Sequence, residues 1–235
     1  MKRGTGKAGK IREHKFSARF RREKLIIPTI FAHNRREFRE RFSKLIPIAD
    51  SFQIDFMDGK FVPGKSVKIS SVPNLRKYPD KKFEAHLMTF NPDRKIKKLR
   101  RKGFMKVIFH YESVRGREEA VIRKTKNEGL KCFIAINPET PAAKISPFLG
   151  KADGILLMGV HPGREHQDFI PRVYEKIREI KKEFPLAVVQ IDGGVNLSTL
   201  KKLRAAGADI LNTGSFVSSS KNPAQALKKL EKEFL

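Results

Sequence analysis

The sequence predicts an α/β fold, a single-domain (β/α)₈ barrel that follows a basic N-terminal extension. From residue 25 onward, eight short apolar runs alternate with amphipathic stretches, which is the pattern of parallel strands joined by helical crossovers. The units average about 26 residues each, which is compact for a closed barrel but within its range. A doubly wound open sheet is the alternative, and it is disfavoured because no Gly-x-Gly-x-x-Gly motif follows the first run. We therefore assign residues 1–24 to a flexible basic extension and residues 25–235 to the barrel.

The strands are expected where apolar residues form short runs between turn residues and charged stretches. Each of these runs is far shorter than the ~20 residues that a membrane-spanning helix needs. In chain order, the predicted strands are Leu25–Ile30, Phe52–Phe56, Phe83–Met88, Met105–His110, Lys131–Ile136, Gly154–Met158, Leu186–Ile191 and Asp209–Thr213.

The helices are expected where apolar residues recur at a spacing of 3.6 between Lys- and Arg-rich positions. Pro171 and Pro223 suit the first turn of a helix, where the missing N–H would be unpaired anyway. Gly103, Gly129 and Gly207 follow helix ends, as C′ glycines do. The predicted helices are Arg36–Leu45, Asp93–Arg101, Glu118–Glu128, Pro171–Phe184, Leu197–Ala206 and Pro223–Phe234, with weaker patterns at Val67–Arg76 and Pro141–Leu149.

The chain is strongly basic: 51 Lys and Arg against 25 Asp and Glu give a formal net charge of +26. The first 25 residues contribute +8 and the other 210 contribute +18, so the charge is not confined to the extension. Such a surface can bind nucleic acid by neutralising phosphates. We favour the simpler interpretation, a solvated basic surface without a specific partner, because no RNP-type motif, helix-turn-helix pattern or zinc finger accompanies the charge.

The cysteine count and the N-terminal sequence indicate the cellular compartment in which we expect the protein. Cys132 is the only cysteine, which excludes an intramolecular disulfide framework and a zinc site of several cysteines. The basic start of the chain is followed by no apolar segment of the kind a secretory signal contains. We expect a cytoplasmic protein with no membrane partner.

Polar residues at the ends of three predicted strands point to catalysis, because barrels place their chemistry at the carboxyl ends of the strands. Gln53 and Asp55 stand two apart on the second strand and therefore point the same way. His86 ends the third strand, and Asp192 closes the seventh. Two carboxylates facing each other across a pocket suit a two-base proton transfer next to a carbonyl, which inverts a stereocentre. A divalent metal held by His86 and both carboxylates would stabilise the enediolate.

Each of these residues also has a structural interpretation. Asp192 precedes two glycines, so its structural interpretation is a turn residue without a catalytic role. For Asp55 the structural interpretation is a loop cap. A lone histidine such as His86 is more often hydrogen-bonded in a core than bound to a metal. We take His110 and His161 as structural or pocket-lining residues.

Two glycine-containing loops are candidates for phosphate binding. They are Asp192–Asn196, which includes Gly193 and Gly194, and Thr213–Ser215, which includes Gly214. In such barrels the loops after strands seven and eight frequently bind phosphate through backbone N–H groups. The alternative is that the glycines only make tight turns.

Several sequence motifs together resemble one family. The most telling is Met57–Pro63, which reads Met-Asp-Gly-Lys-Phe-Val-Pro. The others are Ile27–Ile30, Ile54–Phe56, Ala85–Met88, Asn91–Asp93, Asn137–Pro141, Leu157–Gly163, Asp192–Asn196, Ala206–Asp209 and Gly214-Ser215. Across residues 25–235 the chain resembles ribulose-phosphate 3-epimerase, a family of phosphate-binding TIM barrels. The resemblance implies interconversion of D-ribulose 5-phosphate and D-xylulose 5-phosphate, a divalent metal (Zn, Fe, Mn, Co or Mg) and a homo-oligomer.

The resemblance also assigns roles to single positions. It makes Asp55 and Asp192 the acid/base pair, and Asp55, His86 and Asp192 three of four metal ligands. Thr29 takes the place of a substrate-contacting Ser. The remaining positions implied to line the pocket or bind phosphate are Met57, Met88, Met158, Gly163, Gly193, Gly194, Gly214 and Ser215.

Two departures from the family pattern matter. The fourth metal ligand of the family is a His two residues before the first Asp, and Gln53 stands there. An amide oxygen binds zinc-like metals more weakly than imidazole does, so we expect weakened metal binding, a shift toward Mg²⁺ or Mn²⁺, or no metal binding. The family's Gly-Phe-Gly-Gly loop reads Gly163-Arg164-Glu165-His166. Arg164 or His166 is a candidate side-chain contact for phosphate, and the alternative is that Arg164 points to solvent. This changed loop also leaves open another phosphorylated ketose as substrate. A non-catalytic barrel that binds nucleic acid is the remaining alternative.

Overall fold

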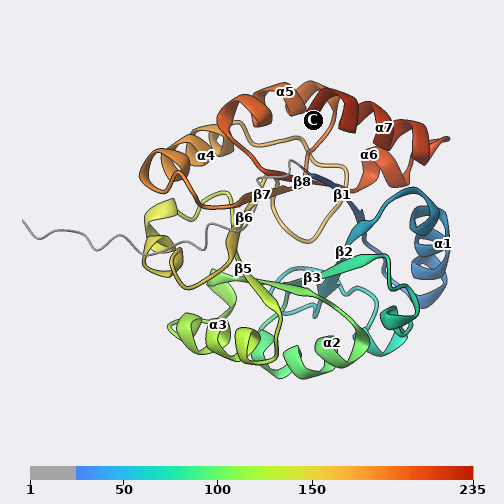
Figure 1. Cartoon of the computed structure of the whole chain (residues 1–235), viewed down its shortest axis with the longest axis horizontal. Coiled ribbons are helices and arrows are strands. Elements are labelled where there is room, and N and C mark those ends of the chain that lie inside the picture. The colour runs from blue at the N-terminus through green and yellow to red at the C-terminus, as the bar shows by residue number, and fades with distance from the viewer. Residues whose placement is uncertain (1–24, 235) are drawn as a thin grey trace, which may run out of the picture.

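Eight parallel strands close into a barrel in sequence order, and the helices form its outer ring (Figure 1). The computed structural model describes residues 25–234, so the predicted basic extension lies outside the described residues. The strands are β1 (Leu25–Ile30), β2 (Ser51–Met57), β3 (Lys82–Met88), β4 (Lys106–His110), β5 (Lys131–Ile136), β6 (Gly154–Met158), β7 (Val189–Asp192) and β8 (Ile210–Thr213). This confirms the predicted (β/α)₈ barrel.

Six of the helices between Leu25 and Phe234 match the predicted ones, the short helix α6 (Ser215–Ser218) was not predicted, and each helix buries apolar side chains. Helix α1, for example, buries Phe38, Phe42 and Leu45 and begins after Asn34, whose side chain accepts a hydrogen bond from the N–H of Glu37. The helices are α1 (Arg35–Leu45), α2 (Ile96–Lys102), α3 (Glu118–Asn127), α4 (Arg172–Glu183), α5 (Leu197–Ala206), α6 (Ser215–Ser218) and α7 (Pro223–Phe234).

The two weaker helix predictions are wrong. Residues 67–76 contain only the short 3₁₀ turns Ile69–Ser71 and Leu75–Lys77, and residues 141–149 contain only Ala142–Lys144 and Ser146–Phe148. Proline explains both outcomes, because Pro73 and Pro147 lack an N–H and cannot continue a helix from the preceding turn. The chain crosses from β2 to β3 and from β5 to β6 without an α-helix.

The interior of the barrel holds a charged layer that the sequence pattern did not indicate. Lys106 forms an ion pair with Glu84, and its Nζ donates to the side-chain oxygen of Gln190 at 2.9 Å. The Gln190 amide donates to Asn212 at 2.6 Å, and the Asn212 amide donates to Glu84 at 3.1 Å. All four side chains are buried, so this closed network links β3, β4, β7 and β8.

Strand register places the candidate residues at one level, above this network. Asp55 lies opposite His86 in the pairing of β2 with β3, and Asp192 lies opposite Met158 in the pairing of β6 with β7. All three polar residues lie near the carboxyl ends of their strands, where barrel enzymes carry their sites. None of the helices between Leu25 and Phe234 is long and apolar enough to cross a membrane.

Candidate active site

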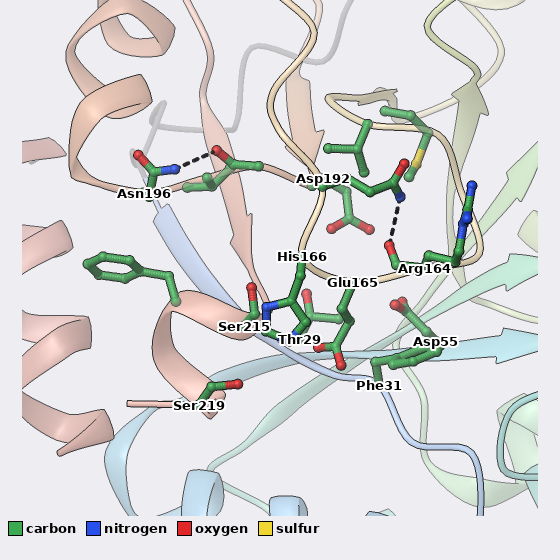
Figure 2. Close-up of a pocket in the computed structure, with 18 of the residues that line it drawn as sticks. Thr29, Phe31, Asp55, Arg164, Glu165, His166, Asp192, Asn196, Ser215 and Ser219 are labelled. Atoms are coloured by element: carbon green, nitrogen blue, oxygen red, sulfur yellow. Dashed lines mark hydrogen bonds between the residues drawn. The ribbon is translucent and has the colours of Figure 1, made fainter. Parts of the chain in front are cut away.

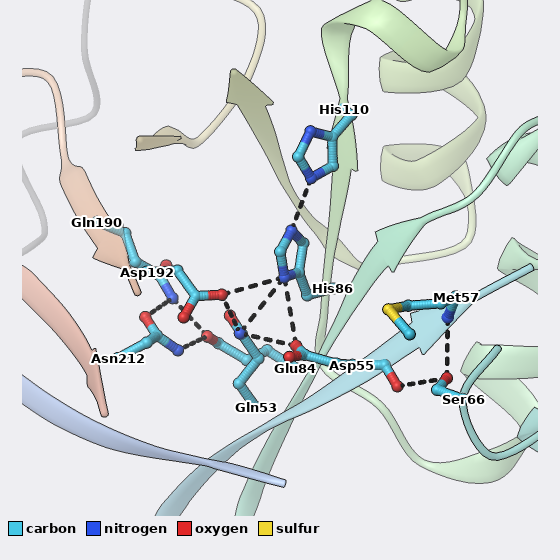
Figure 3. Close-up of polar contacts among 10 residues, drawn as sticks. All are labelled: Gln53, Asp55, Met57, Ser66, Glu84, His86, His110, Gln190, Asp192 and Asn212. Carbon is cyan, nitrogen blue, oxygen red and sulfur yellow. Dashed lines mark hydrogen bonds and ion pairs between the residues drawn. The ribbon is translucent and has the colours of Figure 1, made fainter. Parts of the chain in front are cut away.

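Asp55, His86 and Asp192 meet at the end of the barrel where the strands have their carboxyl ends (Figure 3). Nδ1 of His86 lies 3.3 Å from Oδ1 of Asp55 and 3.1 Å from Oδ2 of Asp192. His86 is fully buried, whereas each aspartate is 7% exposed and lines the cavity above. The barrel therefore brings together the three residues that the sequence singled out from strands far apart in the chain.

Gln53 joins the two carboxylates. Its amide nitrogen donates to Oδ1 of Asp55 at 3.0 Å and to Oδ2 of Asp192 at 2.7 Å. Its amide oxygen is buried and has no hydrogen-bond partner among residues 25–234. A buried acceptor without a partner costs free energy, and rotation of the amide would turn that oxygen toward the carboxylates. The position is thus equipped to donate between two anions or to offer a ligand to a cation.

The protonation equilibria of the cluster are displaced by burial and by the neighbouring charges. Burial raises the pKa of Asp55 to about 6, with the nearby Asp192 charge adding to it, although hydrogen bonds from His86 and Gln53 act the other way. For His86, burial opposes the charged ring, but hydrogen bonds to Asp192 and Asp55 prevail and raise its pKa to about 10. A carboxylate with a pKa near neutrality is suited to both accepting and donating a proton.

The strand that carries Asp55 is fixed by a serine in the loop that follows it. The hydroxyl of Ser66 donates to the backbone oxygen of Asp55 at 2.9 Å and accepts from the N–H of Met57 at 2.8 Å. Ser66 is buried, and these bonds satisfy backbone groups at the end of β2. Ser66 was not among the predicted site residues, because no local sequence signal marks its role.

A second histidine extends the cluster away from the cavity. Nε2 of His110 lies 2.9 Å from Nε2 of His86, and Nδ1 of His110 faces Oε2 of Glu112 at 3.5 Å. Burial lowers the pKa of His110, and the positive charge of His86 acts in the same direction. We expect His110 to be structural or pocket-lining, and Figure 3 shows it behind His86 rather than beside the aspartates.

A cavity of about 580 Å³ opens above the aspartates (Figure 2). Thr29 lines it, and its buried hydroxyl has no hydrogen-bond partner in the described part of the chain. Met88 and Met158 also line the cavity, whereas Met57 is packed beside it with Met88, Phe31 and Val62. Free polar groups and flexible apolar side chains thus face the same space.

The two glycine loops form one end of this cavity. Gly193 and Gly194 have φ values of 95° and 69°, and a Cβ on Gly193 would lie 2.4 Å from Cγ2 of Val160. Only glycine fits there without displacement. Asn196 then caps α5, accepting from the N–H groups of Ser198 and Thr199. Gly214 and Ser215 line the same end, where the short helix α6 begins.

The loop between β6 and α4 crosses the mouth of the cavity and is tied to α1. Nη1 and Nη2 of Arg41 each donate to the carboxylate of Glu165 at 2.9 Å. A Cβ on Gly214 would lie 3.7 Å from that carboxylate, so a negative group stands over the proposed phosphate end. Arg164 lines the cavity but lies across the opening from Ser215 (Figure 2), and Gly163 turns the loop with φ of 106°.

The cluster fits a divalent cation. Asp55, His86 and Asp192 each offer a ligand atom, and these atoms all lie within 4.8 Å of one another. The 3.1 and 3.3 Å separations from Nδ1 of His86 match neighbouring ligands about 3 Å apart around an ion bound at about 2.1 Å. The unpartnered oxygen of Gln53 supplies a fourth donor of the kind that harder cations accept.

Comparison with known proteins gives relatives that span the barrel. A protein named ribulose-phosphate 3-epimerase from Schizosaccharomyces pombe is 30% identical over 209 residues, which cover 87% of this chain and 91% of that one. The enzyme of the same name from Mycobacterium tuberculosis H37Rv is 32% identical over 213 residues, covering 89% and 92%. A rice protein named as the cytoplasmic isoform is 30% identical over 187 residues, covering 78% and 82%.

Solved structures support the fold at lower identity. 3-Hexulose-6-phosphate synthase superposes with a TM-score of 0.69 at 14% identity, covering 90% of this chain and all of that one. KGPDC from Streptococcus mutans gives a TM-score of 0.68 at 14% identity, covering 89% and 96%. The family model described as the ribulose-phosphate 3 epimerase family matches residues 25–218. The chain belongs to the ribulose-phosphate 3-epimerase family.

Proposed function

We propose that this protein interconverts D-ribulose 5-phosphate and D-xylulose 5-phosphate by inverting carbon 3. The observation that carries the proposal is the pair of carboxylates, Asp55 and Asp192, that lines one cavity and is joined through the amide of Gln53. They come from β2 and β7, and so they approach the substrate from different sides of the barrel. The family membership supports the same reaction.

The two aspartates have complementary tasks. One carboxylate removes the proton from carbon 3, and the other returns a proton to the opposite face of the planar enediolate. When the reaction begins, in either direction, one of the two carboxyl groups is protonated and the other is ionised. The raised pKa of Asp55 suits this exchange, because an acid and a base of similar strength are needed in turn.

The rest of the cavity orients the sugar. Gly193, Gly194, Gly214 and Ser215 would bind the phosphate through backbone N–H groups and the serine hydroxyl. The free hydroxyl of Thr29 would bind a sugar oxygen. Met88 and Met158 would cover the reacting carbons and exclude water from them. Phosphate binding at one end fixes which carbon lies between the aspartates.

A divalent cation would be held by Asp55, His86 and Asp192, with the amide oxygen of Gln53 as a further ligand. It would supply Lewis-acid stabilisation of the negative charge that develops on the enediolate oxygens. Without a cation, the amide of Gln53 and the ring of His86 hold the two carboxylates together at this position.

The experiment is a turnover assay on the full chain, purified and supplied in turn with Mg²⁺, Mn²⁺, Co²⁺, Zn²⁺ and Fe²⁺. D-Ribulose 5-phosphate should give D-xylulose 5-phosphate, while Asp55→Asn and Asp192→Asn should each lower kcat by at least about a thousandfold. Asp50→Asn, an exposed aspartate on the outside of the barrel, is the matched control. Absence of turnover with every metal would remove the proposal.

One observation favours a second candidate, an epimerase of another phosphorylated ketose. Glu165 places a carboxylate over Gly214, in a loop that lacks two of the family's glycines. A panel of ketose phosphates from four to seven carbons, compared by kcat/KM, separates the two candidates. The highest value for D-ribulose 5-phosphate supports the first, and a higher value for another ketose supports the second.

We also propose a cytoplasmic homo-oligomer. The resemblance to the family supports the oligomer, and the rice relative named as the cytoplasmic isoform supports the compartment. Light scattering on the full chain would measure the assembly.

A further inference from the structure

We propose that His110 and Glu112 are positioning residues that fix the tautomer of His86, so that its Nδ1 lone pair faces a divalent cation between Asp55 and Asp192. This inference rests on the metal site of the proposed function. It assigns a task to the buried His110 and the partly buried Glu112, which touch neither the cavity nor the reacting atoms.

His86 and His110 form a line that leads away from the aspartates (Figure 3), and the carboxylate of Glu112 lies on the far side of His110. In the pairing of β3 with β4, His86 lies opposite Ile108, and His110 follows two residues later at the end of β4. The ring centroids are 5.1 Å apart with 21° between the planes, and the two Nε2 atoms are 2.9 Å apart. Both rings are fully buried, so water does not compete for these nitrogens.

The position of each proton follows from what each partner can do. Nδ1 of His110 and Oε2 of Glu112 face each other at 3.5 Å, and neither atom has a hydrogen-bond partner among residues 25–234. An ionised carboxylate only accepts, so the proton of a neutral His110 belongs on Nδ1. Its Nε2 is then the acceptor, and the proton between the two rings belongs to Nε2 of His86. When a cation takes the place of the proton on Nδ1, the ring of His86 is neutral and its lone pair lies on Nδ1.

The outer end of the line is fixed by the loop after β5. Oε1 of Glu112 accepts from the backbone N–H of Asn137 at 2.8 Å and from the hydroxyl of Thr140. Phe61 packs against His110, with 4.9 Å between ring centroids. The carboxylate can neither rotate nor leave without breaking these contacts, so it holds His110 and, through it, His86.

The consequence concerns affinity for the cation. Nδ1 of His86 is the atom that lies 3.1 and 3.3 Å from the two carboxylates. Hydrogen bonding of the opposite ring nitrogen orients a metal-binding imidazole and makes it a stronger ligand. Without His110, the other tautomer of His86 would present an N–H to the cation.

The test measures Co²⁺ binding to the full chain by its visible absorption, without substrate. The His110→Phe variant keeps the ring volume but removes the acceptor, and it should weaken Co²⁺ binding about 10- to 100-fold. The His110→Gln variant keeps an acceptor oxygen and should retain affinity within about threefold of the wild type. Glu112→Gln should cause a loss of about 3- to 10-fold, because the amide holds His110 without the charge.

The matched control is His161→Gln. His161 and Glu139 form the same kind of pair, also at 3.5 Å, but they are exposed and do not contact His86. Equal Co²⁺ affinity in the wild type, His110→Phe and Glu112→Gln would overturn the positioning role alone. A wild type that binds no Co²⁺ would overturn both the role and the metal site. If His110→Phe does not fold, the Glu112→Gln titration decides the question.

Discussion

The guanidinium of Arg41 donates two hydrogen bonds, each 2.9 Å long, to the carboxylate of Glu165, and so connects helix α1 to the loop that crosses the cavity. Arg41 also contacts Glu37 at 2.9 Å, and all three side chains are largely buried. The loop is therefore held against α1 by a charge pair at the end of the cavity where we place the phosphate.

This pair predicts opposite effects for its two members. Glu165→Gln removes a negative charge beside the phosphate and should lower KM for the sugar phosphate about fivefold, an effect on the order of 1 kcal/mol. Arg41→Gln leaves the Glu165 carboxylate unpaired and should raise KM by a similar factor. Steady-state kinetics measure KM for both variants, and a second, higher salt concentration shows whether the shifts are electrostatic, because salt screens charges. The control is Arg36→Gln on the same helix, whose pair with Glu40 is exposed. Equal shifts for Arg41→Gln and Glu165→Gln would show that the pair acts only by holding the loop.

The choice of metal should depend on Gln53. Gln53→His replaces an amide with an imidazole and should raise affinity for Zn²⁺ about tenfold or more relative to Mg²⁺. Competition titrations of the purified chain with both metals measure the ratio. An unchanged ratio would mean that Gln53 contributes no ligand, and that its amide serves only to join Asp55 and Asp192.

The charged layer inside the barrel should be costly to break. Lys106→Met leaves Glu84 buried without its cation and should lower the free energy of unfolding by about 3 to 5 kcal/mol. The double variant Lys106→Met with Glu84→Gln should recover part of this loss. Urea denaturation measures both, with Lys151→Met, from an exposed pair with Glu119, as the control. If Lys106→Met is as stable as the Lys151→Met control, the buried network does not contribute to stability as we expect.

Cys132 should be unreactive in the folded protein. The thiol is fully buried, and burial raises its pKa from 9.0 to about 12. The folded state therefore keeps a proton that the unfolded chain releases, so this group reduces stability only as the pH rises from about 9 to about 12. At pH 8.5 a thiol-specific disulfide reagent should label the denatured chain and not the native one. Rapid native labelling would contradict the buried position.

Much of the site could be predicted because a barrel gathers the carboxyl ends of all its strands at one rim. Parallel strands end at one rim, so Asp55, His86 and Asp192 had to lie near one another once eight strands were recognised. Other relationships depend on distances that no local pattern encodes. Arg41 and Glu165 are 124 residues apart, and the partners of Lys106 come from two other strands. The helices predicted at 67–76 and 141–149 failed because proline overrides apolar periodicity.

The central claim is that Asp55 and Asp192 exchange protons with opposite faces of carbon 3. The direct measurement follows conversion of D-ribulose 5-phosphate by the metal-supplied protein in D₂O, with NMR detection of carbon 3. The product should carry deuterium at that carbon, and neither Asp55→Asn nor Asp192→Asn should form it at an appreciable rate. Product that retains its original hydrogen, or full conversion by either variant, would contradict the account.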